Sequence, residues 1–529
     1  MNEESSVRRI YDANVNGRRS RGRPRKTWHD QVNQILESGH VKSQNNRREC
    51  MRRCMNVSEA KSVCQDRVVW RSVLSAYPCG ETANKLAMAG SKPDKVDDLF
   101  SAESNDQNDP LLRHLFEESA ALDVYDKSWI NLAAGCPGPD LLKALTPIFR
   151  EATLHRMEAE DNDNHYLFQY GPTAGLWGLR EALSHFLSKQ YGDTVNRADL
   201  VLTCGASHGL HLAVSILLVP DALVFVEEFT YMIALSTLQT FPMHRIVKVP
   251  MTQDGIDVDK FETMVTEAKN SSSWKCSEQK PFWAMLYTIP TFHNPTGRLL
   301  PPESCKKLVK TAQKHDLLIF CDDVYNLLHF GDGLPPARLF SYDRVEGTES
   351  HGGHVISNGS FSKIMAPGIR VGWMEMAPGL VTNFRKCGIL QSGGSLNNVM
   401  YGLMQSVIEL GLAEKHLLWY KQARMAALCK SLKENLPEGC KFQEARGGYF
   451  IWIELPVNAG DFLAWSKQRG APGAVPALRF IPPDSGPKET ETVTNTNAIR
   501  LSIGFHNADI LEKAGKDIGN MLKMYIAKQ

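Results

Sequence analysis

Short apolar runs alternate with amphipathic segments along most of this chain, from about residue 115 to the C-terminus. In the segment PPESCKKLVKTAQKHD, Leu308, Val309 and Ala312 fall on one side of a helix and lysines on the other. Apolar strands joined by amphipathic helices predict a mostly parallel sheet that helices cover on both faces. The runs that predict strands are ALVFVEE (222–228), FWAMLYTIP (282–290), DLLIFCDD (316–323) and HVISNGSFS (354–362).

Polar residues gather where these apolar runs end. In parallel sheets, ligands bind beyond the carboxyl ends of the strands. Asp322 ends one run in FCDDVY, Tyr325 follows three positions later, and Asn294 follows another run in HNPTG. Each of these residues, taken alone, is equally well explained as a turn residue at a strand end. Their meaning therefore depends on what accompanies them.

A helix start made of small residues is the next feature. The stretch TCGASHGL (203–210) places Gly205, Ala206 and Ser207 before the apolar helical segment LHLAVSILL. Small residues at a helix N-terminus leave backbone N–H groups accessible, which suits a phosphate. The same residues also fit a helix that simply packs closely at this point.

Two cations without an acidic partner mark the stretch GSFSKIMAPGIRVGW (359–373). Lys363 and Arg370 lie seven residues apart behind Ser360, and the stretch contains no carboxylate. Neighbouring cations normally have acidic groups beside them. Their absence predicts that the partner of this stretch is a negatively charged ligand.

Taken in order, these motifs resemble the class I/II pyridoxal-phosphate-dependent aminotransferases of fold type I, and most of all the kynurenine/α-aminoadipate aminotransferase-like branch. The resemblance spans roughly residues 115–525. It implies an α/β fold with a large domain, built on a mostly parallel seven-stranded sheet flanked by helices, and a smaller α/β domain formed by both chain ends. It also implies transfer of an amino group from an aromatic, kynurenine- or 2-aminoadipate-type L-amino acid to a 2-oxo acid such as 2-oxoglutarate. The motifs that carry it are INLAAGCPGP, YGPTAGLWGLREAL, HNPTG, DDVY, GSFSKIMAPGIRVGW, GGYFIWIELP and AIRLSIGF.

The resemblance implies pyridoxal 5′-phosphate as the cofactor. Lys363 matches the lysine that forms the Schiff base and then moves the substrate proton. Asp322 matches the carboxylate that keeps the pyridine nitrogen protonated, so that the ring accepts electrons. The cofactor phosphate would then be the acid that the two cations lack. The other implied cofactor residues are Gly205, Ala206, Ser207, Ser360 and Arg370 at the phosphate, Asn294 and Tyr325 at the ring O3′, and Tyr231 stacked on the ring.

The resemblance also implies how the substrate is held. Arg500 in NAIRLSIGF matches the arginine that grips the α-carboxylate through a bidentate fork. Gly135 in NLAAGCP and Asn294 match the other groups at that carboxylate. Tyr170 in QYGPTAG matches the tyrosine that reaches the phosphate of the neighbouring subunit's cofactor. The expected assembly is a homodimer with shared active sites.

Three positions depart from the pattern of this family. Phe229 replaces the usual proline before Thr-Tyr, His293 replaces the usual glutamine before Asn-Pro-Thr-Gly, and Ala206 stands where a hydroxyl is common. The loop-rich segment 471–497 deviates as well, close to the expected substrate entrance. The motifs for the cofactor remain intact, whereas the pocket for the substrate side chain is left undefined. The amino acid donor therefore stays open.

Composition separates a basic N-terminal extension from the rest of the chain, and the resemblance implies how the remainder divides into domains. Residues 1–90 carry 17 Lys and Arg against 9 Asp and Glu, although the whole chain has a net charge of only +1. We predict a basic, mostly disordered extension (1–90), then a linker, an N-terminal arm and the start of the small domain (91–180). A large cofactor-binding domain (181–415) and a C-terminal small domain (416–529) complete the prediction.

The basic extension contains Arg-Gly-Arg-Pro, which resembles a single AT-hook for the minor groove of A·T-rich DNA. More of the extension resembles the C-terminal tail of a non-LTR retrotransposon reverse transcriptase. We expect it to take no part in the chemistry and expect no nucleic-acid partner. Cys50, Cys54 and Cys64 lack the matching His or Cys pair of a zinc site, so no metal is expected.

The sequence leaves alternatives open for the cellular compartment and for the reaction type. Twelve scattered cysteines and the lack of an apolar run of about 18 residues favour a cytoplasmic protein without a membrane span. Glu3, Glu4 and Asp12 argue against a mitochondrial presequence. A lyase, decarboxylase or racemase would use the same core residues as an aminotransferase. A DNA-binding regulator with an aminotransferase-like domain is a further alternative, although residues 1–90 lack the pattern of a winged helix.

Overall fold

The computed structural model describes most of the chain beyond residue 128. The described residues are 129–163, 165–271, 273–345, 347–348, 350–392, 397–420, 423–482 and 497–529. The predicted basic extension, its Arg-Gly-Arg-Pro motif and its three cysteines lie outside them, as does most of the connector that follows. Predictions for those segments, and the predicted domain boundaries, stay predictions.

A seven-stranded sheet forms the centre of the larger part, in the order β1-β9-β8-β7-β6-β2-β3. Strands β8, β7, β6, β2 and β3 are parallel, and β9 runs antiparallel to both of its neighbours. The four apolar runs of the sequence lie in β2, β6, β7 and β8, so the predicted mostly parallel sheet is confirmed. The strand bounds are β1 (Leu200–Thr203), β2 (Leu218–Glu227), β3 (Arg245–Val249), β6 (Phe282–Thr288), β7 (Leu318–Asp322), β8 (Val355–Ser360) and β9 (Gly372–Met376), with a hairpin of β4 (Met251–Thr252) and β5 (Gly255–Ile256).

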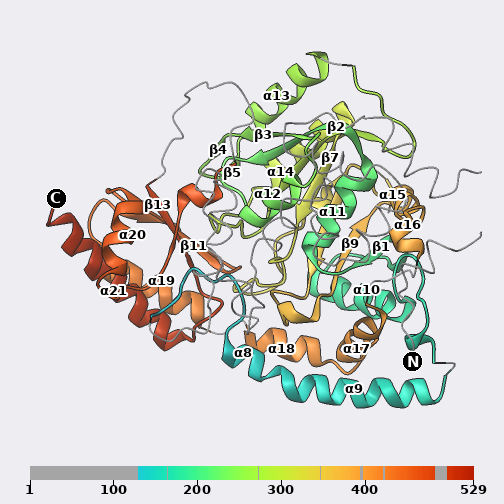
Figure 1. Cartoon of the computed structure of the whole chain (residues 1–529), viewed down its shortest axis with the longest axis horizontal. Coiled ribbons are helices and arrows are strands. Elements are labelled where there is room, and N and C mark those ends of the chain that lie inside the picture. Colours follow the sequence, from blue (N-terminus) through green and yellow to red (C-terminus); the bar gives the residue numbers. More distant parts are fainter. Residues whose placement is uncertain are drawn as a thin grey trace, which may run out of the picture. The chain divides into compact units, whose positions relative to one another are not determined.

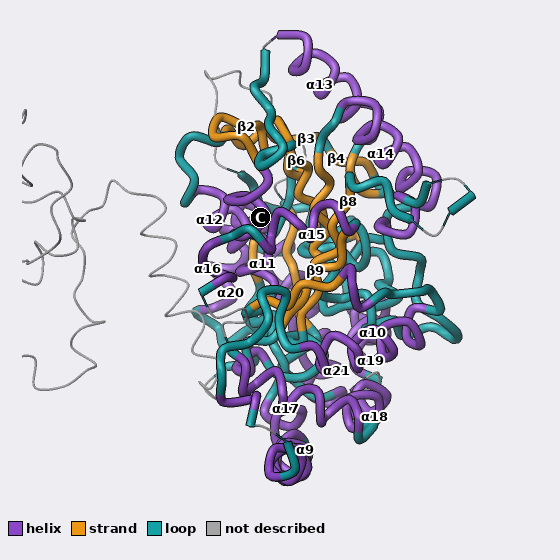
Figure 2. The backbone as a smooth tube through the Cα atoms, turned by 90° about the vertical axis from the view of Figure 1, so that its right-hand side faces the viewer, coloured by secondary structure: helices purple, strands orange, loops and turns teal. Residues whose placement is uncertain are grey.

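Helices cover this sheet on both sides, as Figure 2 shows for α13 and α14 on one side and α11 and α12 on the other. Helix α14 illustrates why the local sequence is helical. Pro302 occupies its first turn, Leu308, Val309 and Ala312 are buried, and Asp316 ends it in the left-handed conformation. The helices of this part are α8 (Pro139–Lys143), α9 (Leu145–Asp161), α10 (Trp177–Tyr191), α11 (Ala206–Leu217), α12 (Met232–Gln239), α13 (Val258–Ser271), α14 (Pro302–His315), α15 (Pro378–Arg385), α16 (Gly388–Gln391), α17 (Asn398–Glu409) and α18 (Leu412–Tyr420).

A second, smaller sheet has its own apolar core. Its order is β10-β11-β13-β12, and all of its pairs are antiparallel. The strands β11 and β13 lie beside helices α19, α20 and α21 (Figure 1), and Leu132 from the first described segment joins their core. The bounds are β10 (Lys441–Phe442), β11 (Phe450–Glu454), β12 (Val475–Pro476), β13 (Ala498–Ser502), α19 (Arg424–Asn435), α20 (Ala459–Lys467) and α21 (Ala508–Ile526).

The N-terminal end of the described chain is hydrogen-bonded to segments of this smaller core. The Leu132 amide donates to the Gly473 carbonyl at 3.0 Å, and the Ser502 amide donates to the Leu132 carbonyl at 2.8 Å. Segments from both ends of the described chain therefore build the small α/β part, as the resemblance implied. Within the described residues, no helix combines the length and the apolar character needed to cross a membrane.

Candidate active site

The carboxyl ends of β6, β7 and β8 open into a cavity of about 200 Å³. Most of the residues predicted to bind the cofactor line it, although they come from distant parts of the sequence. Gly205 lies directly next to this cavity rather than in its lining, and Tyr170 lies elsewhere. The predicted residues that line it are Ala206, Ser207, Tyr231, Asn294, Asp322, Tyr325, Ser360, Lys363 and Arg370.

Lys363 follows β8 and lies at the floor of this cavity. Its Nζ donates to the Gly135 carbonyl at 2.7 Å, and the Tyr449 hydroxyl donates to the Lys363 carbonyl at 2.7 Å. Burial lowers the pKa of the Lys363 ammonium to about 8, and the nearby positive charges of Arg500 and Arg370 act in the same direction. A substantial fraction of this amine is therefore neutral near physiological pH.

Asp322 ends β7 and points its carboxylate at the same cavity. Its Oδ2 accepts from the Tyr287 hydroxyl at 2.8 Å, and its Oδ1 accepts from the Asn358 amide at 3.3 Å. Burial raises the pKa of the Asp322 carboxyl to about 6, while these two hydrogen bonds oppose the rise. Among the described residues no cation forms an ion pair with this carboxylate, so a positively charged ring nitrogen in the cavity would be a suitable partner.

Tyr287 and Asn358 were missed by the sequence reasoning. Asn358 lies directly opposite Asp322 in the β7–β8 register, and Tyr287 belongs to the neighbouring strand β6. Both are buried inside apolar runs. The polar residues within FWAMLYTIP and HVISNGSFS were the available signal, since a buried polar group requires a partner.

Arg370 and the start of α11 form another part of the cavity lining. Arg370 donates to the Cys204 carbonyl at 3.0 Å and to the Pro367 carbonyl at 2.9 Å, which holds its guanidinium over the start of α11. Gly205 has a φ of +87°, and a Cβ there would lie 2.6 Å from Arg370 Nη2. The Ser360 hydroxyl accepts from the Ser362 amide at 3.1 Å. Glycine at position 205 is thus required both by the backbone conformation and by the arginine.

Asn294 and Arg500 join the two sheets at the cavity. Arg500 from β13 donates through Nη1 to Asn294 Oδ1 at 2.9 Å and through Nη2 to the Ala133 carbonyl at 2.6 Å. Its guanidinium also lies over the Phe450 ring, 4.3 Å from the centroid. These contacts hold a buried cation on the small sheet beside groups of the large sheet.

A second cavity of about 320 Å³ extends from the first toward the small sheet. Tyr231, Asn294, Tyr325 and Lys363 line both. Gly135 lines the second one, and a Cβ there would lie 2.9 Å from the Phe450 ring. The residues predicted to meet the substrate therefore surround a space that is continuous with Lys363.

Tyr170 is the predicted site residue that lies apart from the others. Its side chain is 82% exposed and lines neither of the two cavities. Tyr166, Phe168 and Trp177 of the same stretch are also strongly exposed. Within this chain, Tyr170 makes no contribution to the site, which leaves a role toward another subunit as a proposal.

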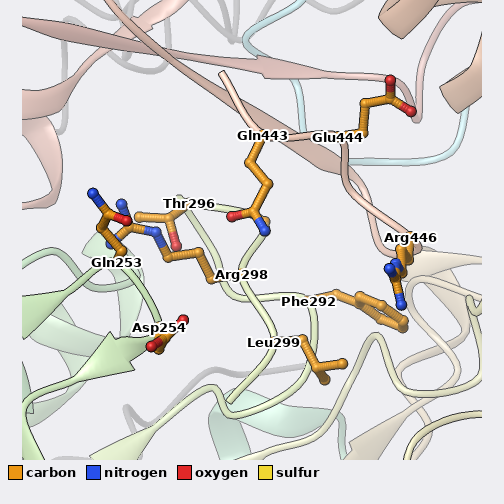
Figure 3. Close-up of a pocket in the computed structure, with 10 residues that line it drawn as sticks. Gln253, Asp254, Phe292, Thr296, Arg298, Leu299, Gln443, Glu444 and Arg446 are labelled. Carbon is orange, nitrogen blue, oxygen red and sulfur yellow. The ribbon is translucent and has the colours of Figure 1, made fainter. Parts of the chain in front are cut away.

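A separate hollow of about 200 Å³ lies on the other side of the turn that carries Asn294. Figure 3 shows Thr296, Arg298, Gln253 and Gln443 around it. Among the described residues that line the hollow there is no lysine, and the Arg298 guanidinium donates to the Thr252 carbonyl at 2.6 Å. The described residues around this hollow lie beside the turn and do not include the lysine that the predicted chemistry needs.

A buried polar network holds the turn that carries Asn294. Glu227 accepts from His293 Nε2 at 3.0 Å and from the Thr288 hydroxyl at 2.7 Å. His293 Nδ1 lies 2.8 Å from the Thr296 hydroxyl. His293, which departs from the usual glutamine, thus connects Glu227 at the end of β2 to the turn that carries Asn294.

Replacing His293 by alanine is expected to raise the KM for the amino acid roughly tenfold, with a smaller change in kcat. The turn loses its anchor, so the bond between Asn294 and Arg500 is no longer held in place, and a lost hydrogen bond to a charged group costs about 1.5–3 kcal/mol. His293→Gln is the matched control, because its amide can still meet Glu227. Steady-state kinetics of the two variants would contradict this role if both had the wild-type KM.

The fold and site place the chain among known enzymes. The sequence profile described as Aminotransferase class I and II matches residues 127–466. The chain therefore belongs to the class I and II aminotransferases, which are enzymes that depend on pyridoxal phosphate.

Individual relatives agree with this placement. The aromatic-amino-acid aminotransferase 1 of Thermococcus litoralis is 29% identical over 64% of this chain and 76% of its own length. The mitochondrial kynurenine/alpha-aminoadipate aminotransferase of Mus musculus is 29% identical over 62% of this chain and 78% of its own. The crystal structure of the Pyrococcus horikoshii kynurenine aminotransferase, a complex with PMP, superposes with a TM-score of 0.64 at 28% identity, covering 82% of this chain and 99% of that one.

Proposed function

We propose that this enzyme transfers the amino group of an L-amino acid of the aromatic, kynurenine or 2-aminoadipate type to a 2-oxo acid such as 2-oxoglutarate. The observation that carries the proposal is the convergence of Lys363, Asp322 and Arg500 on one continuous space. The names of the relatives from Thermococcus litoralis and Mus musculus support the substrate class.

The residues of the first cavity fit pyridoxal 5′-phosphate. Ser360, Arg370 and the start of α11 would hold the phosphate, since they offer donors and positive charge, and no Asp or Glu is found among the described lining residues at that end. Asp322 would hold the ring nitrogen, and Asn294 and Tyr325 the ring hydroxyl. When bound, the cofactor supplies an electron sink that stabilises negative charge at the substrate Cα.

The chain itself supplies proton movement and orientation. Lys363 Nζ would remove the proton from the substrate Cα as a base and deliver it to the cofactor carbon C4′ as an acid, because its lowered pKa allows both roles. Arg500 would hold the α-carboxylate, which fixes the Cα–H bond toward Lys363. Burial raises the pKa of the Tyr325 hydroxyl well above its ordinary value, so it remains a neutral donor.

A homodimer with shared sites is part of the proposal. The support is the group of exposed aromatic side chains at Tyr166, Phe168, Tyr170 and Trp177, because such clusters mark protein contact surfaces. Tyr170 would reach the phosphate site of the partner.

A cytoplasmic location is proposed from the scattered cysteines of the sequence.

A panel of single amino acids mixed with the purified enzyme tests the reaction type. An aminotransferase should convert a donor to its 2-oxo acid in one turnover without an acceptor, and the absorbance band of the resting enzyme should disappear. A lyase or decarboxylase would release a different product over many turnovers. Release of ammonia, carbon dioxide or the D-amino acid in place of the 2-oxo acid would refute the proposal.

The rate at which pyridoxal phosphate attaches to the cofactor-free protein is expected to rise with pH and to be half-maximal near pH 8. Only a neutral amine attacks the aldehyde, and the protonated fraction of Lys363 falls as the pH rises through about 8. An exposed lysine would titrate near about 10.4. The growth of the absorbance band, followed from about pH 6 to 10, measures this. A half-maximum close to the ordinary lysine value would contradict the effect of burial.

A further inference from the structure

The second cavity carries a cation that the proposed chemistry does not use. Its walls are largely apolar, with Trp129, Met232, Ile233 and Val475 among them. Arg500 lies on one side of this space, and Arg479 also lines it. Among the residues that the structure describes in its lining there is no Asp or Glu.

The short helix that carries Arg479 packs against Arg500. This 3-10 helix spans Ala477–Phe480, and its Phe480 ring lies 4.9 Å from the Arg500 guanidinium. The Thr230 amide donates to the Phe480 carbonyl at 2.8 Å, which attaches this helix to the residue preceding Tyr231. Phe229 and Trp452 pack in the same small cluster. The backbone that carries Arg479 is therefore attached both to the Arg500 side of the cavity and to the segment that carries Tyr231.

Two arginines that line one cavity are suited to a ligand with two carboxylates. An arginine is weakly hydrated and binds carboxylates through a planar fork, so it is suited to a half-buried position. A largely apolar cavity lined by both arginines suits a ligand with methylene groups between two carboxylates. Building on the function proposed above, we infer that Arg479 binds the distal carboxylate of a dicarboxylic amino or 2-oxo acid while Arg500 holds the α-carboxylate.

Lys467, another cation in the lining of the second cavity, provides the control. Lys467 ends helix α20, and its residue is exposed. An exposed ammonium is screened by water and contributes little to binding. Lys467→Met therefore removes a positive charge from the same cavity without removing the proposed fork.

Equilibrium binding to the holoenzyme tests the inference without turnover. Glutarate has two carboxylates and pentanoate has one, and neither has an amino or oxo group that can react. Isothermal titration calorimetry of Arg479→Met should show glutarate binding weakened by about tenfold to a hundredfold, which corresponds to loss of a charge-assisted hydrogen bond. Pentanoate should bind as it does to the wild type, and Lys467→Met should leave both within about twofold.

Kinetics provide the second measurement. The KM of Arg479→Met for 2-oxoglutarate should rise by the same factor, whereas its KM for pyruvate and its kcat should stay close to those of the wild type. Arg479→Lys keeps the charge but loses the fork, so it should weaken glutarate by less. This variant keeps the test available if Arg479→Met does not fold.

Several results would overturn the inference. These are an equal loss for glutarate and pentanoate in Arg479→Met, a loss in Lys467→Met as large as in Arg479→Met, or a wild type that binds the two acids equally. The proposed function fails separately, if the wild type forms no 2-oxo acid from any amino acid while still binding glutarate through Arg479.

Discussion

Replacing Lys363 by alanine is expected to reduce turnover by about 10²–10⁴-fold or more, since the loss of proton transfer alone has this size. The variant should still take up pyridoxal phosphate non-covalently, because Arg370, Ser360 and the start of α11 remain in place. Absorbance spectroscopy and steady-state kinetics measure the two effects.

Chemical labelling tests whether Lys363 is the lysine that binds the cofactor covalently. Borohydride reduction of the wild-type holoenzyme, followed by peptide mapping, should attach the cofactor to Lys363. Lys467 is the internal control, because it lines the second cavity but lies on a helix of the small part. A label on Lys467, or on any other lysine, would show that the assignment of Lys363 is wrong.

Replacing Asp322 by asparagine is expected to slow removal of the substrate Cα proton by roughly 10²–10³-fold while the cofactor remains bound. Asparagine keeps the shape and can still meet Asn358, but it removes the charge opposite the ring nitrogen. Breaking a buried charge pair costs about 3–5 kcal/mol, which sets the size of the effect. Single-turnover kinetics with α-deuterated substrate measure the step.

Asp323 is the matched control for this variant. Its carboxylate accepts from the Ser357 hydroxyl and lies near Arg338, which pairs with Glu375 in a buried group outside the lining of both cavities. Asp323→Asn should therefore lower the melting temperature and leave the single-turnover rate nearly unchanged. A larger rate loss at Asp323 than at Asp322 would mean that the wrong carboxylate was placed beneath the cofactor.

The part of the fold that sequence reasoning predicts well is the part held by local patterns. A buried parallel strand needs a continuous apolar run, so β2, β6, β7 and β8 were recognisable. The polar residues at their ends were recognisable for the same reason, since a strand end is visible in the sequence. Asp322 and Lys363 belong to this group.

Contacts between distant strands could not be predicted in the same way. The Asn358 amide meets Asp322 because β7 and β8 pair in one particular register, and a shift by one residue would direct it to the other face. The Glu227–His293 pair joins residues from β2 and the turn after β6, and neither shows its partner locally. The strands β10 and β12 have only two residues each, too few to show an alternating pattern.

The small core has a consequence for how such an enzyme diversifies. Arg500 and Arg479 belong to the small sheet and the helix beside it, whereas Lys363 and Asp322 follow strands of the large sheet. On the proposed roles of these residues, mutations in the small core would alter which acids are bound without touching the groups proposed to move the proton. Substrate range and catalytic rate can therefore change independently during the evolution of this gene. A duplicated copy can acquire a new substrate range while its chemistry is preserved.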